Sequence, residues 1–431
     1  MTDRTTQPDD TSGLPLDGIR VLDLGMFWAG PFAGKWLADG GAQVIKIESG
    51  SHPDNLRILA RGVYPNGEPG ERSWNRSGMI NERNRNKLGI TIEMGTTEGR
   101  EIFRRLVAIS DVVIENFSNR VMKKWELDYD HLSKINPEII LASVYSQGST
   151  GPESGYVSFG GTLEQLAGIT YITGYANEMP GVLTVQLPDP AGGAMATGLI
   201  LSALRQRRLT GKGLHIDLSQ RENVVGLLGA QVLDFGMNER ITERIGNRDP
   251  HMAPHGCYRC SGEDAWVTLA ISSDDEWAAL AHLIGQESLI HDDRFATVGA
   301  RHRNHDELDS IISDWTKDRG KIDTMHQLQD AGIAAGAVYT AADLYADPHL
   351  EARSFWEATD EPDAGPHRFP GRPGQLSKTP LGTRLPTPTL GQHNEYVFRE
   401  LLGMTDDEYT ALETSGLITT EPTEAAQKGR L

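Results

Sequence analysis

The chain has 431 residues, a formal net charge of −19 and two cysteines. Its length exceeds the roughly 250–300 residues at which a single core stops growing, so we expect two domains. The acidic excess opposes binding to nucleic acid or to an anionic membrane surface, and any anionic ligand must be held by local cations. No apolar run reaches the ~18 residues that a membrane span needs, and residues 1–13 do not resemble a signal peptide. We therefore expect a cytoplasmic protein that binds neither nucleic acid nor membrane.

Short strands and helices alternate after a polar start. Residues 1–14 lack apolar periodicity, which predicts a disordered tail. We expect strands at 19–24, 42–48, 87–93, 111–116 and 138–145, and helices at 32–38 and 96–109. This alternation is typical of a mostly parallel α/β sheet that binds ligands at the carboxyl ends of its strands.

Three loops follow expected strands. The loop at 25–31 matches neither the G-x-G-x-x-G pattern nor a phosphate-binding loop, so a nicotinamide or ATP enzyme is unsupported. Lys123, Lys124 and Trp125 come after the strand at 111–116, and form either a cationic and aromatic ligand site or a solvated helix face. The Gly- and Ser-rich loop at 146–155 is either a mobile lid or a plain linker.

Asp189 stands between Pro188 and Pro190 and is followed by Gly192 and Gly193. The prolines restrict the backbone, and the glycine pair allows another backbone or a ligand to come close. A helix is expected at 194–205, so Asp189 would lie just before a helix N-terminus, where the dipole stabilises a carboxylate. A nucleophile and a helix cap both fit this pattern.

Cys257 and Cys260 form a lone Cys-x-x-Cys. There is no second pair and no pair of histidines at zinc spacing. We interpret them as part of a strand in a reducing compartment, with a metal or redox role as the alternative. We therefore predict no metal site.

Nine phrases resemble the class III (CaiB/BaiF-type) CoA-transferases. They follow the family order and cover almost the whole chain: 16–24, 29–31, 41–48, 84–87, 111–117, 136–144, 187–193, 210–217 and 347–350. The resemblance implies a Rossmann-like large α/β domain plus a smaller α/β domain in a ring-shaped subunit that forms an interlocked dimer. The partner would be a second copy of the chain or, alternatively, a related subunit in a heteromer.

The large domain would take residues 15–237 and 342–431, and the small domain would take residues 238–341. This fits the sequence, because the segment 262–271 and a helix expected at 274–283 have the character of an insertion between two halves.

The resemblance also implies the chemistry and its participants. Asp189 would attack an acyl-CoA, such as succinyl-CoA, and form a mixed anhydride and then an aspartyl-CoA thioester, from which a free carboxylic acid takes the CoA. Coenzyme A would thus enter as a thioester substrate, with no permanently bound cofactor. The CoA-binding positions of the family fall on Trp28, Ala29, Ser49, Ile92, Asn116, Phe117, Ser118 and Lys124.

The residues at the positions that bind the CoA phosphates differ from those of the family pattern. Ser49 and Gly95 stand where formyl-CoA transferase has cations, so Arg83, Arg85 or Lys123 would have to contribute. For the acid substrate we expect contacts from Phe27, Phe159, Gly160 and His255. Phe27 and Trp28 would suit an apolar acyl group, or could be core residues.

Other departures separate the activities found in the family. The racemases have Gly-His-Asp where this chain has Gly155-Tyr156-Val157, and a tyrosine with a pKa near ~10 is a poor base. Gly160 replaces a glutamate of formyl-CoA transferase. Phe159-Gly160 is more similar to the branch that acts on larger aromatic or dicarboxylic acids. We therefore predict an acyl-CoA:carboxylate CoA-transferase, with an acyl-CoA racemase or epimerase, or a non-catalytic subunit, as alternatives.

Overall fold

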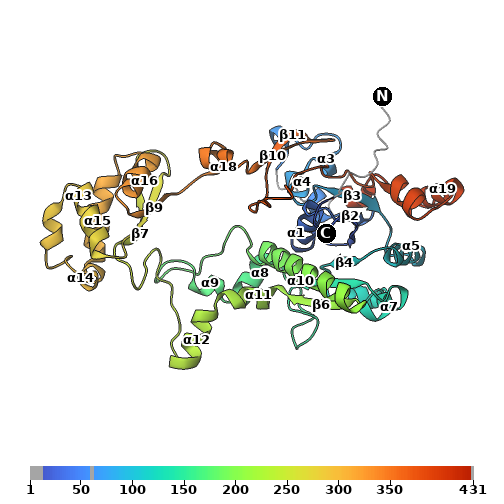
Figure 1. Ribbon diagram of the computed structural model, residues 1–431, viewed down its shortest axis with the longest axis horizontal. Helices are drawn as coiled ribbons and strands as arrows, with labels where there is room; N and C mark the ends of the chain where they lie inside the picture. The colour runs from blue at the N-terminus through green and yellow to red at the C-terminus, as the bar shows by residue number, and fades with distance from the viewer. Residues whose placement is uncertain (1–12, 59–62, 429–431) are drawn as a thin grey trace. The chain divides into compact units, whose positions relative to one another are not determined.

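The computed structural model describes residues 13–58 and 63–428 (Figure 1). Most of the expected tail, residues 1–12, lies outside the described residues. The chain divides into two compact units, of which the first takes residues 1–169, 182–232 and 352–431 and the second takes 170–181 and 233–351. The expected small domain, 238–341, falls inside the second unit, and its exact bounds remain a prediction.

A parallel sheet of six strands forms the centre of the first unit. Its order is β3-β2-β1-β4-β5-β6. The strands are β1 (Arg20–Asp23), β2 (Gln43–Glu48), β3 (Lys87–Thr91), β4 (Val112–Glu115), β5 (Ile140–Tyr145) and β6 (Leu214–Ser219). This is the strand order of a Rossmann fold, in which ligands bind where the order reverses, between β1 and β4. The predicted Rossmann-like α/β fold is thus confirmed, while the ring-shaped subunit and the interlocked dimer remain predictions.

Helices cover both faces of this sheet. Val21 belongs to a core shared with α1 (Ala29–Asp39) and α10 (Pro188–Thr210), and Leu22 belongs to a core shared with α5 (Thr97–Ala108) and α7 (Tyr129–Ile135) (Figure 1). Successive residues of a strand point to opposite faces, so a strand buried on both sides is apolar throughout. The expected strands and the helix at 96–109 are confirmed to within about two residues.

The remaining elements of the first unit are short. They are α2 (Asn55–Ile58), α3 (Ser73–Arg76), α4 (Gly78–Arg83), α6 (Val121–Lys124), α8 (Gly160–Leu166), α11 (Gln220–Leu227), β10 (Trp356–Glu361), β11 (Gly365–Pro370), a π-helix at Tyr396–Leu401, α19 (Asp406–Thr414) and α20 (Glu424–Gln427). Three further helices contain or adjoin the division between the units, namely α9 (Ile169–Ile172), α12 (Gly229–Asn238) and α18 (Pro348–Ala352). None of the helices in the described part of the chain is long and apolar enough to cross a membrane.

The second unit has its own antiparallel sheet and core. Its elements are β7 (His255–Arg259), β8 (Trp266–Ala270), β9 (Ala334–Ala337), α13 (Asp274–Leu283), α14 (Val298–Arg303), α15 (His305–Thr316), α16 (Lys321–Asp330) and α17 (Ala341–Tyr345). The rings of Trp277 and Phe295 lie 6.1 Å apart in its core. The expected helix at 274–283 is confirmed.

Two helices begin earlier than the sequence predicts. Helix α1 starts at Ala29 instead of residue 32, and α10 starts at Pro188 instead of residue 194. Proline lacks an N–H, but the first turn of a helix does not use that donor, so Pro31 and Pro190 are tolerated there. Gly193 lies inside α10 because a Cβ at this position would be 2.7 Å from the carbonyl oxygen of Ala29.

Side chains from the end of the chain cover the edge strand β3. His393 Nδ1 accepts the N–H of Gly89 at 2.9 Å, and Asn394 Oδ1 accepts the N–H of Thr91 at 2.9 Å. An exposed strand edge presents unpaired donors to other chains. The C-terminal segment satisfies two of these donors and ties itself to the sheet.

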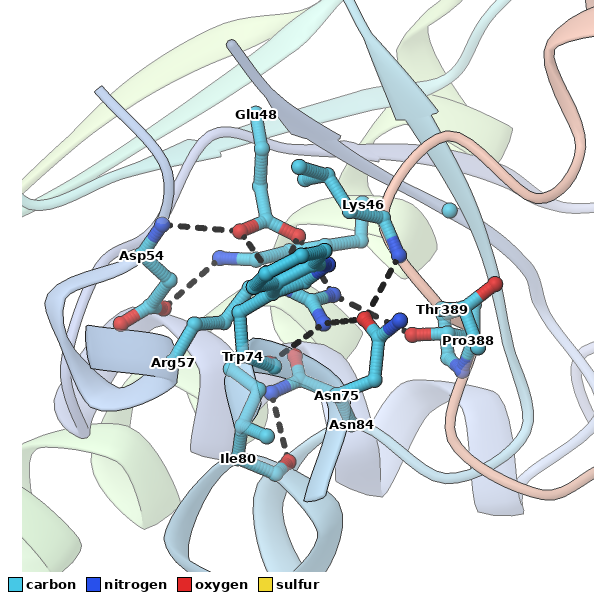
Figure 2. A network of polar contacts seen from close by, with 12 residues as sticks. Lys46, Glu48, Asp54, Arg57, Trp74, Asn75, Ile80, Asn84, Pro388 and Thr389 are labelled. Atoms are coloured by element: carbon cyan, nitrogen blue, oxygen red, sulfur yellow. Dashed lines mark hydrogen bonds and ion pairs between the residues drawn. The ribbon is translucent and has the colours of Figure 1, made fainter. Parts of the chain in front are cut away.

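A buried charge cluster, Lys46, Glu48, Asp54 and Arg57, lies at the carboxyl end of β2 (Figure 2). The Arg57 guanidinium donates to both oxygens of Glu48, at 2.7–3.0 Å. Lys46 Nζ is 3.2 Å from Asp54 Oδ2 and also donates to the carbonyl of Gly25. Burial works to raise the pKa of Glu48, but the charge and hydrogen bonds of Arg57, the charge of Lys46 and the N–H of Asp54 together hold the pKa below its ordinary value.

Replacing Arg57 with Met should leave the Glu48 carboxylate buried and unpaired, and should cost about 3–5 kcal/mol of unfolding free energy. Chemical denaturation with urea measures this loss. The matched control is Arg104→Met, because Arg104 pairs with Glu101 at 3.2 Å on the surface of α5, where a pair contributes less than about 1 kcal/mol. Equal losses in the two variants would contradict the role of the cluster.

Candidate active site

The loop after β1 is held by a residue from the next strand of the sheet. Asn116, which follows β4, accepts the N–H of Met26 at 2.7 Å and donates to the carbonyl of Met26 at 2.9 Å. Gly25 and Gly30 approach so closely that a Cβ on either would lie 2.8 Å from backbone atoms of the other. The loop is therefore fixed at the point where the strand order reverses.

Phe27 occupies the left-handed region, with φ 61°. This conformation is strained for a bulky side chain, and it persists here because Asp54 Oδ1 accepts the N–H of Phe27 at 3.2 Å. The ring meets that of Phe159 edge to face, with centroids 5.5 Å apart. Phe27 is half-buried and Phe159 is 60% exposed, and neither belongs to a hydrophobic core of the described chain. Two of the predicted substrate-binding residues are thus brought together outside the core.

Trp28 and Arg83 form a stacked pair beside this loop. The guanidinium carbon of Arg83 lies 4.0 Å from the centre of the Trp28 ring, a cation–π contact. Trp28 Nε1 and Arg83 Nε are both buried, and neither has a hydrogen-bond acceptor in the described part of the chain. Buried donors without acceptors are rare in folded proteins and call for an explanation.

Asp189 is the second residue of α10, not the residue before the helix, as the sequence suggested. The residue at the N-cap is Leu187, and no side chain caps this helix, so the interpretation of Asp189 as a cap is wrong. Gln186, directly before Leu187, has a φ of 52°, and its carbonyl accepts the N–H of Asp189 at 3.1 Å. A sharp turn therefore leads directly into the helix that carries the carboxylate.

The two oxygens of Asp189 have different neighbours. With the amide of Gln220 oriented to face the carboxylate, its nitrogen donates to Oδ1 at 3.1 Å and to the carbonyl of Pro188 at 3.2 Å. The other oxygen, Oδ2, lies against Gly160, where an added Cβ would be 2.6 Å away. Gly160, a predicted substrate-binding position, thus contacts the carboxylate directly.

Glu164, on α8, fixes the turn before Asp189. Its two carboxylate oxygens accept the N–H of Leu183 at 3.1 Å and that of Leu187 at 2.9 Å. The side chain is fully buried. A carboxylate in this position orders the approach to α10 and places a negative charge near Asp189.

The pKa of Asp189 is raised from 3.8 to about 6. Burial is the main cause, the charge of Arg83 lowers it, and the charge of Glu164 raises it further. At neutral pH the side chain is therefore mostly ionised but more basic than an ordinary aspartate, as suits a nucleophile.

The other predicted CoA-binding residues follow successive strands of the sheet. Ser49 is buried after β2, and its hydroxyl accepts the N–H of His52 at 2.9 Å. Ile92 follows β3 with its side chain wholly inside the core, so only its backbone can meet a ligand. After β4, Phe117 packs on Trp125 at 5.6 Å between ring centroids. Ser118 and Lys124 are exposed.

The candidate phosphate cations differ in their availability. Arg85 is buried and donates to both oxygens of Asp39, at 3.1 and 2.7 Å, so it is not free to bind a phosphate. Lys123 and Lys124 are exposed, and the described chain offers neither of them an ion pair. These two lysines remain the better candidates.

The second unit holds the other residues singled out from the sequence. His255 Nδ1 lies 2.6 Å from the carbonyl oxygen of Asn247, and its role in acid binding stays a prediction. Cys257 and Cys260 are free thiols on or beside β7. No three His, Cys, Asp or Glu side chains within residues 13–58 and 63–428 are grouped so as to hold a metal ion.

The loop at 146–155 borders a cavity of about 250 Å³ in the first unit. The cavity is lined by Gln147, Thr150, Gly151, Pro152, Glu153, Ser154, Ser219, Arg221 and Glu222. Arg221 pairs with Glu153 across it. The loop is thus anchored by an ion pair, and Asp189 does not line this cavity.

Sequence reasoning missed two residues around Asp189, and it named a third for a different role. Gln220 and Glu164 are ordinary polar residues in helical segments, and no local motif marks either of them. Arg83 was named only as one of several phosphate cations. Arg83 could have been recognised as a binding residue, because an arginine that is buried when the chain folds needs an anionic partner.

Comparisons with a family model, with curated proteins and with solved structures all relate this chain to CoA-transferases or to CaiB/BaiF proteins. A family model described as CoA-transferase family III matches residues 16–394. The chain is 35% identical over 404 residues to the Succinyl-CoA--D-citramalate CoA-transferase of Chloroflexus aurantiacus, covering 94% of this chain and 98% of that one. It is 31% identical over 387 residues to the Succinate--glutarate CoA-transferase of Agrobacterium fabrum, covering 90% and 96%. The crystal structure of a CaiB/BaiF family protein from Brucella suis has a TM-score of 0.81 and 34% identity, and covers 90% and 99%.

Replacing Asp189 with Asn should stabilise the protein relative to the wild type as the pH rises from about 4 to about 7. The folded wild type holds the Asp189 proton more tightly than the unfolded chain does, so the wild type loses stability across this window, whereas Asn has no proton to lose. After allowance for partial exposure, the shift from 3.8 to about 6 corresponds to about 1–3 kcal/mol.

Scanning calorimetry of both proteins across this pH range measures the difference. Measurements at about pH 3, below both pKa values, serve as the internal control, because Asp189 is mostly protonated there in the folded and the unfolded state. A stability difference that does not change with pH would contradict the raised pKa.

Proposed function

Because the chain belongs to CoA-transferase family III, and is therefore a CoA-transferase, we propose that it moves CoA from a donor acyl-CoA to a free dicarboxylic acid through Asp189. The single observation that carries this proposal is the setting of Asp189, a basic, half-buried carboxylate with one oxygen against a glycine. The names of the relatives, which include succinyl-CoA, succinate, D-citramalate and glutarate, support succinyl-CoA as the donor and a dicarboxylic acid as the acceptor.

The proposed reaction has four steps that conserve every group. The Asp189 carboxylate attacks the thioester carbonyl and expels CoA thiolate, which gives a mixed anhydride. The thiolate then attacks the Asp189 carbonyl, releases the donor acid and forms an aspartyl-CoA thioester. The acceptor carboxylate attacks this thioester, expels CoA thiolate again and forms a second anhydride. The thiolate finally attacks the acceptor carbonyl, which gives the acceptor acyl-CoA and releases the free Asp189 carboxylate. Every intermediate is an activated acyl group, so no step has to form one from a free acid unaided.

The contacts of Asp189 support this cycle. Gln220 donates to Oδ1 and can donate in the same way when this oxygen becomes negative, in the two tetrahedral intermediates formed by attack on the Asp189 carbonyl. Oδ2 lies in the space that a Cβ on Gly160 would need, so the glycine allows the carboxylate to take this position. The N-terminus of α10 stabilises negative charge at this position.

The alternatives receive less support. A racemase needs a base on each face of the α-carbon, and Tyr156 and Val157, which replace the family histidine and aspartate, are exposed. A non-catalytic subunit would have no need for the ordered turn and the glycine around Asp189.

Assembly and location remain predictions. Exposed apolar side chains on α10 and α11, among them Met195, Leu199, Leu201 and Leu227, support contact with another subunit, which we expect to be a second copy of this chain or a related subunit. We also keep the expectation of a cytoplasmic enzyme.

Replacing Asp189 with Ala should lower transfer from succinyl-CoA by a factor on the order of 10⁴ or more, because the attacking group is lost. Binding of CoA should persist. Hydroxylamine added during turnover should convert Asp189 to a hydroxamate in the wild type alone, as mass spectrometry of peptides would detect. Normal turnover in the variant would exclude Asp189 as the nucleophile.

Replacing Gly160 with Ala should displace Asp189 Oδ2, because the new methyl group would lie 2.6 Å from it. We expect kcat/KM to fall about 100-fold, as a misplaced reacting group predicts. The matched control is Gly161→Ala in the next position of α8, where an added Cβ meets nothing within 4 Å. Similar kinetics in the two variants would show that the contact is irrelevant to transfer.

A further inference from the structure

Arg83 is a buried arginine without a dedicated anionic partner. It is 6% exposed and ends α4, and its Nη1 donates to the carbonyl of Met79 at 2.7 Å. The nearest carboxylate oxygen in an ion pair with it, Glu82 Oε2, is 3.8 Å from Nε, beyond hydrogen-bond distance. The other oxygen of Glu82 is already 2.7 Å from Lys35 Nζ.

A buried charge costs free energy unless it is paired and hydrogen-bonded. Burial lowers the pKa of Arg83, and the charges of Glu82, Asp54 and Asp189 only partly oppose this effect. No ion pair joins Arg83 to Asp189 among the described residues. Arg83 is thus a buried cation whose Nε–H no acceptor in the described chain satisfies, and whose charge acts on Asp189.

Trp28 adds a second unused donor to the same place. Its ring stacks under the guanidinium at 4.0 Å, and its buried Nε1–H has no acceptor. The stacking covers one face of the guanidinium, and Nε–H lies on its edge without an acceptor, as a donor of the kind that pairs with a carboxylate. An anion that enters the site would meet donors that nothing else in the described chain satisfies.

We propose that Arg83, stacked on Trp28, binds the non-reacting carboxylate of a dicarboxylic acid while the other end of the acid reacts at Asp189. This inference rests on the proposed function and assigns its specificity to one side chain. A CoA phosphate is the competing anion. The phosphates are separated from the reacting sulfur by the pantetheine arm, whereas the charge of Arg83 acts on Asp189 itself. The exposed Lys123 and Lys124 suit the phosphates better.

A monocarboxylic acid would leave Arg83 unpaired in the closed site. A site built to hydrogen-bond a substrate group discriminates strongly against an analogue that lacks it. Arg83 is therefore a specificity-determining residue that favours dicarboxylic over monocarboxylic acids of equal length.

The test compares succinate with butyrate as labelled acceptors, with succinyl-CoA as the common donor. In Arg83→Met, which keeps an unbranched apolar stem but removes the guanidinium, the ratio of kcat/KM for succinate to that for butyrate should fall about 100-fold or more, mainly through the KM for succinate. Arg83→Lys should give an intermediate ratio, because the charge remains but the fork is lost. Lys124→Met should raise the KM for succinyl-CoA and leave the acid ratio unchanged.

Three results would overturn the inference. An equal rise in the KM of both acids together with that of succinyl-CoA would assign Arg83 to a phosphate. An equal fall in kcat for both acids, with the acid limb of the pH profile moved to higher pH, would limit Arg83 to tuning Asp189. The succinate-to-butyrate ratio of kcat/KM could also stay unchanged in both Arg83→Lys and Arg83→Met, with circular dichroism showing that Arg83→Met is folded. That result would show that Arg83 does not recognise the acid.

Failure of the proposed function has a different signature. Wild-type protein would then transfer no CoA from any donor, or Asp189→Ala would retain turnover. If transfer depends on Asp189 but the succinate-to-butyrate ratio of kcat/KM does not change in the Arg83 variants, the proposed function stands and only the inference about Arg83 fails.

Discussion

The site depends on charges buried below its first loop. Lys46 holds the carbonyl of Gly25, and Asp54 pairs with Lys46 while it accepts the N–H of Phe27. Separating buried partners leaves an uncompensated charge, which costs more than ordinary loop contacts provide. The cluster can therefore keep Phe27 in a conformation that costs about 1–3 kcal/mol. The aromatic wall of the site follows from this constraint.

A second constraint is the close crossing of α1 and α10. Gly193 lets the backbone of α10 reach the carbonyl of Ala29, where any larger residue would meet it at 2.7 Å. Asp189 lies one turn before Gly193, and Trp28 directly precedes Ala29. Asp189 thus lies on a rigid helix and Trp28 at the start of another, and elements of this kind hold side chains more precisely than loops do.

The sequence predicted the sheet because its strands are marked locally, and the local pattern also singled out Asp189, whose role as a nucleophile remains a prediction. Strands buried on two faces form apolar runs such as 111–116, and Asp189 stands in an unusual proline and glycine setting. The helix starts were predicted too late because prolines and glycines normally end helices, and only tertiary contacts show that Gly193 has a packing role. The partners of Asp189 could not be predicted, because Gln220 and Glu164 reach it only through the fold.

The acidic character of the chain poses a problem that the arrangement of charges addresses. In the proposed reaction, a dicarboxylic acid would have to approach a protein of net charge −19 and the carboxylate of Asp189, both of which repel it. When Asp189 is free, its charge competes for the field of Arg83 and opposes entry of the acid. Once Asp189 carries CoA as a thioester it is neutral, and the cation of Arg83 is available to the acid alone. Transfer of CoA onto the nucleophile would thus itself favour binding of the acceptor, and the order of the two half-reactions would follow from charge.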